Sequence, residues 1–183
     1  MIKRYLTDAI NQLCFENHKI AFLSGPRQCG KTTLAKMLLA QRSESSYHNW
    51  DDIEFRRIWT KAPKQIIAEQ WGTQAKRSTP LIVLDEIHKA RAWKSSLKGV
   101  YDTARLPIDI LVTGSARLNV YKKGSDSLMG RYYNFRLHPF SLAELAGTSS
   151  ISKDPEQIKK EIFEIDPNSR HMTILAPCRK EAY

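Results

Sequence analysis

The residues best suited to chemistry lie in a glycine-rich loop near the start of the chain. The segment Gly25–Thr32 fits the pattern G-x4-G-K-[ST] at every fixed position, between an apolar run and a stretch of helix-forming residues. Backbone N–H groups of such a loop converge on a phosphate, and its glycines allow a close approach that a side chain would block. This Walker A pattern predicts a phosphate-binding loop. The residues expected to form it are Gly25, Pro26, Arg27, Gln28, Cys29, Gly30, Lys31, Thr32 and Thr33.

Individual side chains of this loop have distinct expected roles. Lys31 would bridge the β- and γ-phosphates of a nucleotide, and Thr32 would give its hydroxyl to Mg²⁺. Thr33 can donate a further hydrogen bond to the α-phosphate. Cys29 stands near a predicted helix N-terminus, where the pKa of a thiol can fall, so a redox switch is one interpretation. We favour the other, a passive loop residue.

Two acidic residues follow one of the longest wholly apolar runs of the chain. Leu81–Leu84 has the composition of a buried strand in a parallel sheet, and Asp85 and Glu86 come directly after it. As a Walker B pattern, the segment predicts that Asp85 holds Mg²⁺ beside Thr32 and that Glu86 accepts a proton from an attacking water molecule. The alternative is a pair of acids that cap the next helix. The phosphate-binding loop upstream favours the metal and base roles.

A third polar group ends another predicted strand. The mostly apolar segment Ile108–Val112 runs into Thr113, Gly114 and Ser115. Ligands of parallel sheets sit at the carboxyl ends of the strands, so the hydroxyls of Thr113 and Ser115 are expected near the γ-phosphate, as a polar sensor. The sequence does not choose between these two residues, and an ordinary turn is the alternative.

Arginines are candidates for completing the site. Arg131 follows Gly130 and precedes the last predicted strand, and it could reach the γ-phosphate of its own or a neighbouring subunit's nucleotide as an arginine finger. The alternative for Arg131 is a surface ion pair. Arg117 is the weaker candidate for the same role. Asp51 and Asp52 are predicted to cap a helix rather than to bind metal.

Alternating strands and helices must position these residues. The predicted strands are 20–23, 47–50, 81–84, 108–112 and 132–137. The predicted helices are 2–13, 32–41, 53–59, 64–71, 92–104, one that starts within 141–145 and one over 154–165. The alternation over residues 1–147 predicts an α/β fold, a three-layer sandwich around a parallel sheet. Together with the Walker A and B patterns and the polar sensor, this predicts a P-loop NTPase sandwich of the additional-strand type. Residues 148–183 are expected to form a linker, the last helix and an unpatterned tail.

The composition bounds the class of protein. The 183 residues include 29 Lys and Arg against 19 Asp and Glu, which gives a formal net charge of +10, and 42% of them are apolar. These values exclude a collagen-like, fully disordered or membrane-spanning chain, and the charge favours a polyanionic partner. Three cysteines without metal-ligand spacing, and an N-terminus without a signal-peptide pattern, predict a soluble cytoplasmic protein.

Most of the surplus charge lies in residues 61–147, which carry fourteen basic and seven acidic side chains. Arg91, Lys94 and Lys98 share one face of a predicted helix, with Trp93 between them. Such a face can contact the phosphates of DNA, and an exposed aromatic ring can stack on a base. The alternative is a solvated face with Trp93 in the core. Because the sequence contains no base-reading motif, DNA stays an open partner.

Four segments carry a resemblance to a known family: Gly25–Leu34, Leu84–Ile87, Val112–Ser115 and Gly130–Tyr132. In this order they resemble a large group of prokaryotic AAA-type P-loop ATPases, over about residues 1–147. The resemblance implies ATP, rather than GTP, and Mg²⁺. Members of that group usually continue into a C-terminal domain that looks like a restriction endonuclease. We expect this chain to represent only the ATPase domain, either truncated or standing alone.

Three functional hypotheses follow. The first is an Mg²⁺-dependent ATPase that hydrolyses ATP to ADP and phosphate with water activated by Glu86. The second is a nucleotide-gated binding or scaffold module, associated with DNA or not, that hydrolyses little. The third is a P-loop kinase, which Glu86 disfavours because a base poised for water is a poor feature in a kinase. A homo-oligomer would complete the site in trans, and no membrane partner is expected.

Overall fold

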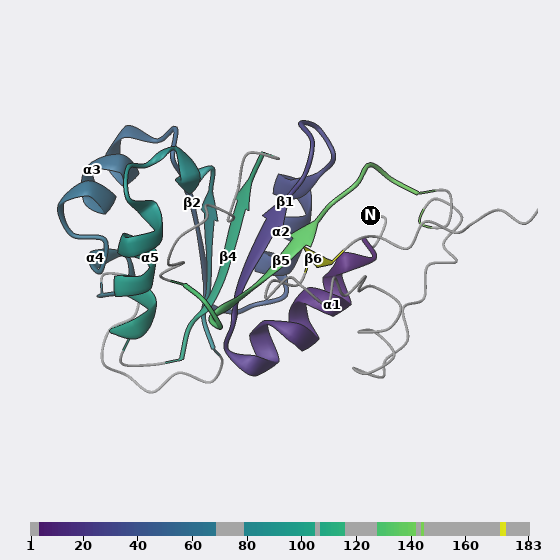
Figure 1. Cartoon of the computed structure of the whole chain (residues 1–183), viewed down its shortest axis with the longest axis horizontal. Helices are drawn as coiled ribbons and strands as arrows, with labels where there is room; N and C mark the ends of the chain where they lie inside the picture. Colours follow the sequence, from purple (N-terminus) through teal and green to yellow (C-terminus); the bar gives the residue numbers. More distant parts are fainter. Residues whose placement is uncertain are drawn as a thin grey trace, which may run out of the picture.

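A parallel β-sheet forms the centre of the protein. The computed structural model describes residues 4–68, 79–104, 107–115, 128–141, 144 and 173–174. The strands are β1 (Ile20–Ser24), β2 (Ser45–Asn49), β3 (Leu81–Asp85), β4 (Asp109–Gly114), β5 (Tyr132–Arg136) and β6 (Thr173–Ile174). Their order is β2-β3-β4-β1-β5-β6, and each of these pairings is parallel (Figure 1). Because β4 lies between β1 and β3, the predicted additional-strand arrangement is confirmed.

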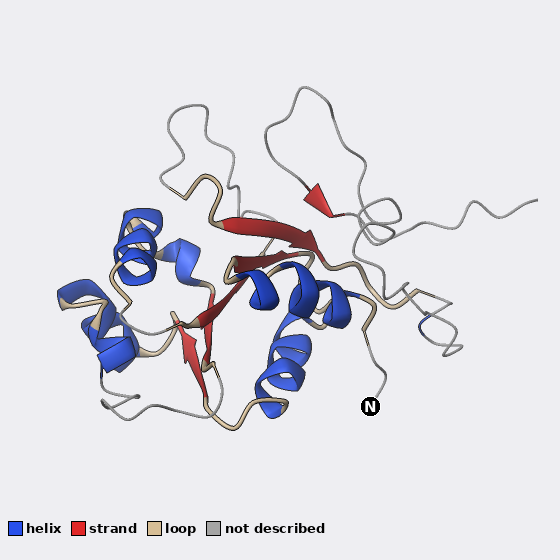
Figure 2. Ribbon diagram, turned by 90° about the horizontal axis from the view of Figure 1, so that it is seen from below, coloured by secondary structure: helices blue, strands red, loops and turns tan. Residues whose placement is uncertain are grey.

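Helices cover both faces of this sheet (Figures 1 and 2). The α-helices are α1 (Leu6–Leu13), α2 (Lys31–Ala40), α3 (Ile53–Lys61), α4 (Gln65–Ala68) and α5 (Trp93–Asp102), and the 3₁₀ turns are η1 (Phe15–Asn17) and η2 (Ile87–Lys89). One buried cluster joins α1 and α2 to the sheet, and a second cluster joins α3, α4 and α5 to its other face. The predicted three-layer α/β sandwich is therefore confirmed. No helix within the described ranges has the length and apolarity that a membrane span requires.

The side chains of the central strands alternate between the two cores. Along β1, Ala21 and Leu23 join the cluster beneath α1 and α2, whereas Ile20 and Phe22 join the one beneath α3 to α5. Both β3 and β4 are buried along their whole length, which explains why they are apolar runs rather than alternating patterns. The more polar strand β2 is partly exposed at the edge of the sheet.

Some boundaries differ from those predicted. β2 starts two residues earlier, at Ser45, and ends before Trp50. β4 continues to Gly114, so Thr113 belongs to the strand and not to a turn. The short strand β6 pairs with β5, in a tail where no pattern was found. The linker at 148–150, the helix expected over 154–165 and the C-terminal part of the helix expected at 64–71 lie outside the described residues.

At the N-terminus of α3, the adjacent acidic residues Asp51 and Asp52 make different contacts. The carboxylate of Asp52 accepts hydrogen bonds from the backbone N–H groups of Glu54 and Phe55, at 2.8 and 3.4 Å. Asp52 is therefore the N-cap, as the sequence predicts. Asp51 instead forms an ion pair with Lys89, which lies after β3.

Candidate functional site

A cleft of about 1150 Å³ opens beyond the carboxyl ends of β1, β3 and β4. This is the edge at which parallel α/β sheets bind ligands. The residues that line it are Pro26, Arg27, Gln28, Gly30, Lys31, Thr32, Thr33, Asp51, Asp85, Glu86, His88, Lys89 and Ser115. The fold thus brings together the glycine-rich loop, the acidic pair at the end of β3 and one of the two hydroxyls at the end of β4.

Two residues of the predicted loop lie behind it and do not line the cleft. At Gly25 the backbone comes so close to the segment after β5 that a Cβ atom would lie 2.4 Å from Leu137 O. Cys29 is only 4% exposed, and its Sγ lies 3.9 Å from Lys31 Nζ. Packing therefore requires a glycine at position 25, and Cys29 is a buried residue of the loop.

The loop leads directly into the N-terminus of α2. Gly30 has a left-handed backbone with φ +92°, and its carbonyl accepts the hydrogen bond of Leu34 N at 2.9 Å. The positive end of the helix dipole therefore faces the cleft, where it favours an anion. Lys31 Nζ donates to Gly25 O at 3.0 Å and to Pro26 O at 2.5 Å, so the ammonium group is held against the loop itself.

Three hydroxyl groups converge on the carboxylate of Asp85. Thr32 Oγ1 donates to Oδ2 at 3.3 Å, Tyr47 donates to the same oxygen at 2.5 Å, and Thr113 Oγ1 donates to Oδ1. Burial and the hydrogen bond to this carboxylate raise the pKa of Tyr47 well above its ordinary value, so its hydroxyl keeps its proton. Asp85 is 6% exposed, and its orientation is set by these donors.

These contacts separate the two hydroxyls that the sequence could not rank. Thr113 is fully buried beneath Asp85, whereas Ser115 lines the cleft. Tyr47 escaped the sequence analysis, because the polar strand β2 carries no motif. The signal that could have found it is its position in a strand beside β3, in line with Val83 and two residues before the end of the strand.

The oxygen atoms near the loop suit Mg²⁺. Thr32 Oγ1 and Asp85 Oδ2 lie 3.3 Å apart at the wall of the cleft. Among the described residues, no group of three or more His, Cys, Asp or Glu is arranged to hold a metal ion. Mg²⁺ takes few protein ligands and keeps waters and substrate phosphates as the others. The two residues therefore fit this ion as one side of its coordination shell.

Glu86 reaches the cleft through an unusual backbone. Its φ of 59° and ψ of 19° are left-handed, a conformation that costs energy for a residue with a side chain. The backbone N–H of Glu86 donates to Thr113 O at 2.9 Å, which fixes the turn. Its side chain makes no cap hydrogen bond to η2, so the capping alternative is not supported. The carboxylate instead faces the cleft, where it lies 3.6 Å from His88 Nε2.

A cationic group stands beside this carboxylate. Lys89 Nζ contacts both oxygens of Asp51, at 2.9 and 3.0 Å, and lies 4.0 Å from Glu86 Oε2. Burial lowers the pKa of His88, so its imidazole is neutral at neutral pH. Lys89 and Asp51 both line the cleft, although the sequence suggested only a capping role for Asp51.

Arg131 lies at the amino ends of the strands, on the side of the sheet opposite the cleft. It immediately precedes β5, and its carbonyl accepts the N–H of Ile20 at the start of β1. Its guanidinium binds the carboxylate of Asp102 at 2.8 and 3.3 Å, which is the surface ion pair named as the alternative. The fold therefore does not bring Arg131 to the cleft of its own chain. Arg117 lies outside the described residues.

The basic helix α5 packs Trp93 inward. Trp93 makes an edge-to-face contact with Phe22, with ring centroids 5.7 Å apart. Lys94 Nζ lies 5.9 Å from the centroid of the same ring. Trp93 is thus engaged with the core, which matches the simpler of the two interpretations of this helix.

The sheet with its additional strand, and the glycine-rich loop that leads into a helix at its carboxyl edge, define a P-loop NTPase. The chain belongs to the AAA domain family, whose match covers residues 17–146. This membership confirms the AAA-type class that the motifs predicted. Among curated proteins, none matches the chain.

Solved structures with a similar fold come from distant proteins. C. elegans PCH-2 is 19% identical, with a TM-score of 0.46 over 74% of this chain and 40% of that one. The Aeropyrum pernix ORC1 protein in complex with DNA is 16% identical, with a TM-score of 0.47 over 71% and 42%. Rhizobiales Trip13 is 15% identical, with a TM-score of 0.42 over 69% and 49%. The chain thus matches less than half the length of each.

Proposed function

We propose that this chain binds ATP together with Mg²⁺ and hydrolyses it to ADP and phosphate. The observation that carries the proposal is a single cleft lined by Lys31, Thr32, Asp85 and Glu86. A cation, two oxygen ligands for a metal and a carboxylate base are the parts that phosphoryl transfer to water requires. Membership of the AAA domain family supports the nucleotide-binding part of this proposal.

Binding rearranges the contacts of the loop. Lys31 exchanges the carbonyls of Gly25 and Pro26 for oxygens of the β- and γ-phosphates, a change from neutral acceptors to charged ones. The N–H groups at the start of α2 add donors for the same phosphates. Thr32 and Asp85 hold Mg²⁺, which when bound neutralises the charge of the phosphate oxygens.

Glu86 then serves as the general base. It takes a proton from a water molecule whose oxygen attacks the γ-phosphorus, while the bond from that phosphorus to the bridging oxygen of ADP breaks in line. Ser115 lies at the end of β4 in the same cleft and can donate to the γ-phosphate. The proton on Glu86 leaves with the phosphate product or passes to solvent.

A binding module with little hydrolysis is the second candidate. It is favoured by Arg131, which pairs with Asp102 at the opposite edge of the sheet and so adds no cation to this cleft. On this hypothesis the chain binds ATP but releases little phosphate at any protein concentration. A turnover per subunit that rises with protein concentration would instead indicate that Arg131, or another group, completes the site in an assembly. DNA, the open polyanionic partner, is tested by the same assay with and without a duplex.

The deciding experiment compares two site variants with two matched controls. Lys31→Ala should abolish ATP binding in calorimetry, whereas Lys36→Ala, at an exposed position on the same helix, should bind like the wild type. Glu86→Gln should bind ATP normally but release phosphate at least about a hundredfold more slowly, the usual loss when a general base is removed. Glu54→Gln, an exposed acid on α3, should hydrolyse normally.

Each outcome separates the hypotheses. Phosphate release that survives Glu86→Gln would remove the base role. Tight ATP binding by the wild type without phosphate release, even at high protein concentration, would favour the binding module. An unchanged affinity in Lys31→Ala would contradict nucleotide binding at this loop.

A further inference from the structure

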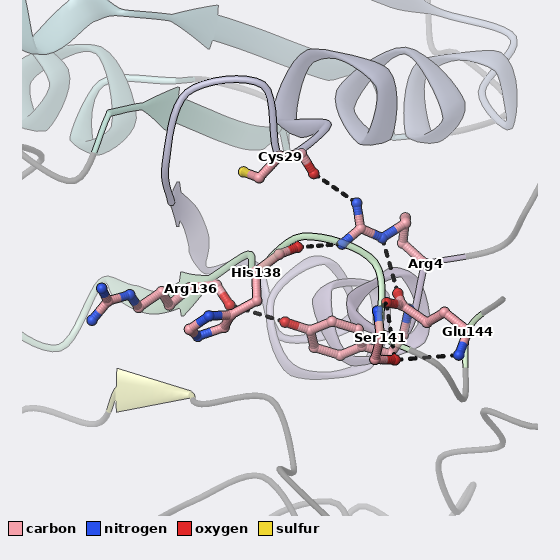
Figure 3. Close-up of polar contacts among 7 residues, drawn as sticks. Arg4, Cys29, Arg136, His138, Ser141 and Glu144 are labelled. Carbon is pink, nitrogen blue, oxygen red and sulfur yellow. Dashed lines mark hydrogen bonds and ion pairs between the residues drawn. The ribbon is translucent and has the colours of Figure 1, made fainter.

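Arg4 joins distant parts of the chain behind the glycine-rich loop (Figure 3). It is only 2% exposed. Its Nη1 donates to the carbonyl of Cys29 at 2.8 Å, its Nη2 to that of His138 at 2.5 Å, and its Nε to Glu144 Oε1 at 2.9 Å. The guanidinium therefore ties the loop to the segment that follows β5.

The carboxylate that anchors Arg4 is itself fully engaged. The side chain of Glu144 is 0% exposed, and it accepts N–H groups from Tyr5 at 3.1 Å and from Ser141 at 2.9 Å, besides the guanidinium. Burial opposes its ionisation, but these donors outweigh burial and lower its pKa. A buried, ionised pair held by these hydrogen bonds keeps one geometry, because leaving either charge unpaired is costly.

The bond to Cys29 sets the direction of the next N–H group. In a planar trans peptide, the carbonyl and the following N–H point in opposite directions, and no described peptide bond is cis. Arg4 pulls the Cys29 carbonyl to the rear of the loop, so the N–H of Gly30 points forward. Gly30 lines the cleft. A charged donor on the carbonyl also polarises the peptide and strengthens its N–H as a donor.

Both glycines of the loop rest against this rear support. A Cβ atom at Gly30 would lie 3.0 Å from Arg4 Nη1, and one at Gly25 would lie 2.4 Å from Leu137 O. Leu137 is in turn bound through its N–H to Ser24 O at 2.8 Å, just ahead of the loop. The shape of the loop therefore depends on Arg4, Leu137, His138 and Glu144.

We propose that Arg4 is a positioning residue for nucleotide binding, which acts by holding the Cys29–Gly30 peptide with its N–H toward the phosphate site. The inference rests on the proposed function, since it assigns the support of that same site. Through its hydrogen bonds, Arg4 also makes the affinity for nucleotide depend on how His138 and Glu144 are placed.

The chain contains a matched control for a merely structural role. Arg42 Nη2 contacts Asp109 Oδ2 at 3.1 Å, and Asp109 is 2% exposed. The guanidinium of Arg42 lies over Phe15 at 5.4 Å, much as that of Arg4 lies over Phe140 at 4.3 Å. This second pair stands at the amino end of β4, away from the loop. Removing it costs packing and charge but leaves the loop intact.

The experiment measures the Kd for ADP with Mg²⁺ by calorimetry in full-length Arg4→Met and Arg42→Met, at a temperature where circular dichroism shows both folded. ADP carries the phosphate nearest the loop and is not hydrolysed. Arg4→Met should raise Kd at least about tenfold, the effect of one lost charge-assisted contact, and Arg42→Met less than twofold. Arg4→Lys, which keeps the charge but not the forked donors, should fall between wild type and Arg4→Met.

A second readout needs no nucleotide. The Gly30 amide in the ¹H–¹⁵N spectrum of the unliganded protein should shift in Arg4→Met and stay in place in Arg42→Met. An unchanged Gly30 signal with unchanged Kd in Arg4→Met, or an equal loss of affinity in both variants, would overturn the inference. If the wild type itself does not bind ADP or ATP, the proposed function fails, and the Gly30 signal still decides whether Arg4 orients the peptide. Should Arg4→Met not fold, Arg4→Lys and Glu144→Gln replace it, and wild-type affinity in both would contradict the role.

Discussion

The hydroxyl of Tyr47 donates to Asp85 Oδ2 at 2.5 Å, so a residue of the edge strand β2 orients the acid that ends β3. Thr32 donates to the same oxygen at 3.3 Å and is the second proposed ligand of the metal. Tyr47 is therefore a hydrogen-bond partner of a residue that would hold Mg²⁺. Partners of metal ligands tune both the direction and the basicity of the ligand.

Removing this hydroxyl should weaken the use of Mg²⁺. In Tyr47→Phe we expect the Mg²⁺ concentration for half-maximal hydrolysis to rise about tenfold, the lower range for loss of such a partner. The measurement is ATP turnover across a Mg²⁺ titration. Tyr133→Phe, on β5 and packed against the same core cluster as Tyr47, is the matched control. An equal Mg²⁺ requirement in Tyr47→Phe and the control would contradict the role of Tyr47.

Substitutions of the two hydroxyl residues at the end of β4 should have different effects, one on stability and the other on activity. Thr113 is fully buried and bonds Asp85, so Thr113→Val should lower the free energy of unfolding by about 1–3 kcal/mol, the cost of an unsatisfied buried acceptor. Ser115 lines the cleft, so Ser115→Ala should change that free energy by less than about 0.5 kcal/mol while slowing phosphate release. Urea unfolding and steady-state turnover measure the two effects. The reverse pattern would mean that Thr113, and not Ser115, faces the phosphate.

Two glycines should respond in opposite directions to the same substitution. Gly25→Ala places a methyl group 2.4 Å from Leu137 O and should cost about 1–3 kcal/mol of stability through overpacking. Gly99→Ala lies within α5 with nothing within 4 Å and should add about 0.5–1 kcal/mol, because glycine is a poor helix former. Melting temperatures of the two variants test this. An unchanged melting temperature in Gly25→Ala would show that the segment after β5 moves to make room for the methyl group.

Asp109 should make the free energy of unfolding fall as the pH rises. Burial raises its pKa to about 6, while Arg42 partly offsets this. The folded protein then keeps a proton that the unfolded chain releases near pH 4. Stability should therefore fall as pH rises from about 4 to 6, by about 3 kcal/mol from this group, and stay level above that window.

The variant Asp109→Asn should lack this contribution. The check is the free energy of unfolding at several pH values, as the difference between wild type and variant, since other groups titrate in both. Asp102→Asn, a half-exposed partner of Arg131, should keep the wild-type slope. A difference curve for Asp109→Asn that is flat between pH 4 and 6 would refute the assignment.

Patterns that are local in sequence were predictable. The apolar runs of β3 and β4 are local because both faces of these strands are buried, and the loop from Gly25 is local because a phosphate needs consecutive N–H groups. The pairing of Arg4 with Glu144 joins residues 140 positions apart and leaves no pattern in either neighbourhood. Tyr47 was missed for the same reason, because only the register of β2 with β3 places it near Asp85.

The sequence also contains enough information to predict that Arg131 lies away from the cleft. Residues that precede a strand of a parallel sheet lie at the amino edge, and those that follow it lie at the carboxyl edge, where the cleft is. Arg131 precedes β5, and the structure accordingly pairs it with Asp102, away from the phosphate-binding loop. Strand direction alone therefore argues against a finger that serves its own subunit.

The ion pair of Arg4 with Glu144 and the partly buried ion pair of Arg42 with Asp109 stand at opposite edges of the same sheet. The pair of Arg42 with Asp109 touches nothing in the cleft, so an engineer can replace it with apolar residues of similar volume, a change that often leaves a protein equally or more heat-resistant. The pair of Arg4 with Glu144 allows no such exchange, since its arginine also holds the loop. During evolution, substitutions should be tolerated at the pair of Arg42 with Asp109 more readily than at the pair of Arg4 with Glu144. Relatives adapted to different temperatures are expected to vary at the amino edge, while the carboxyl edge keeps its charges.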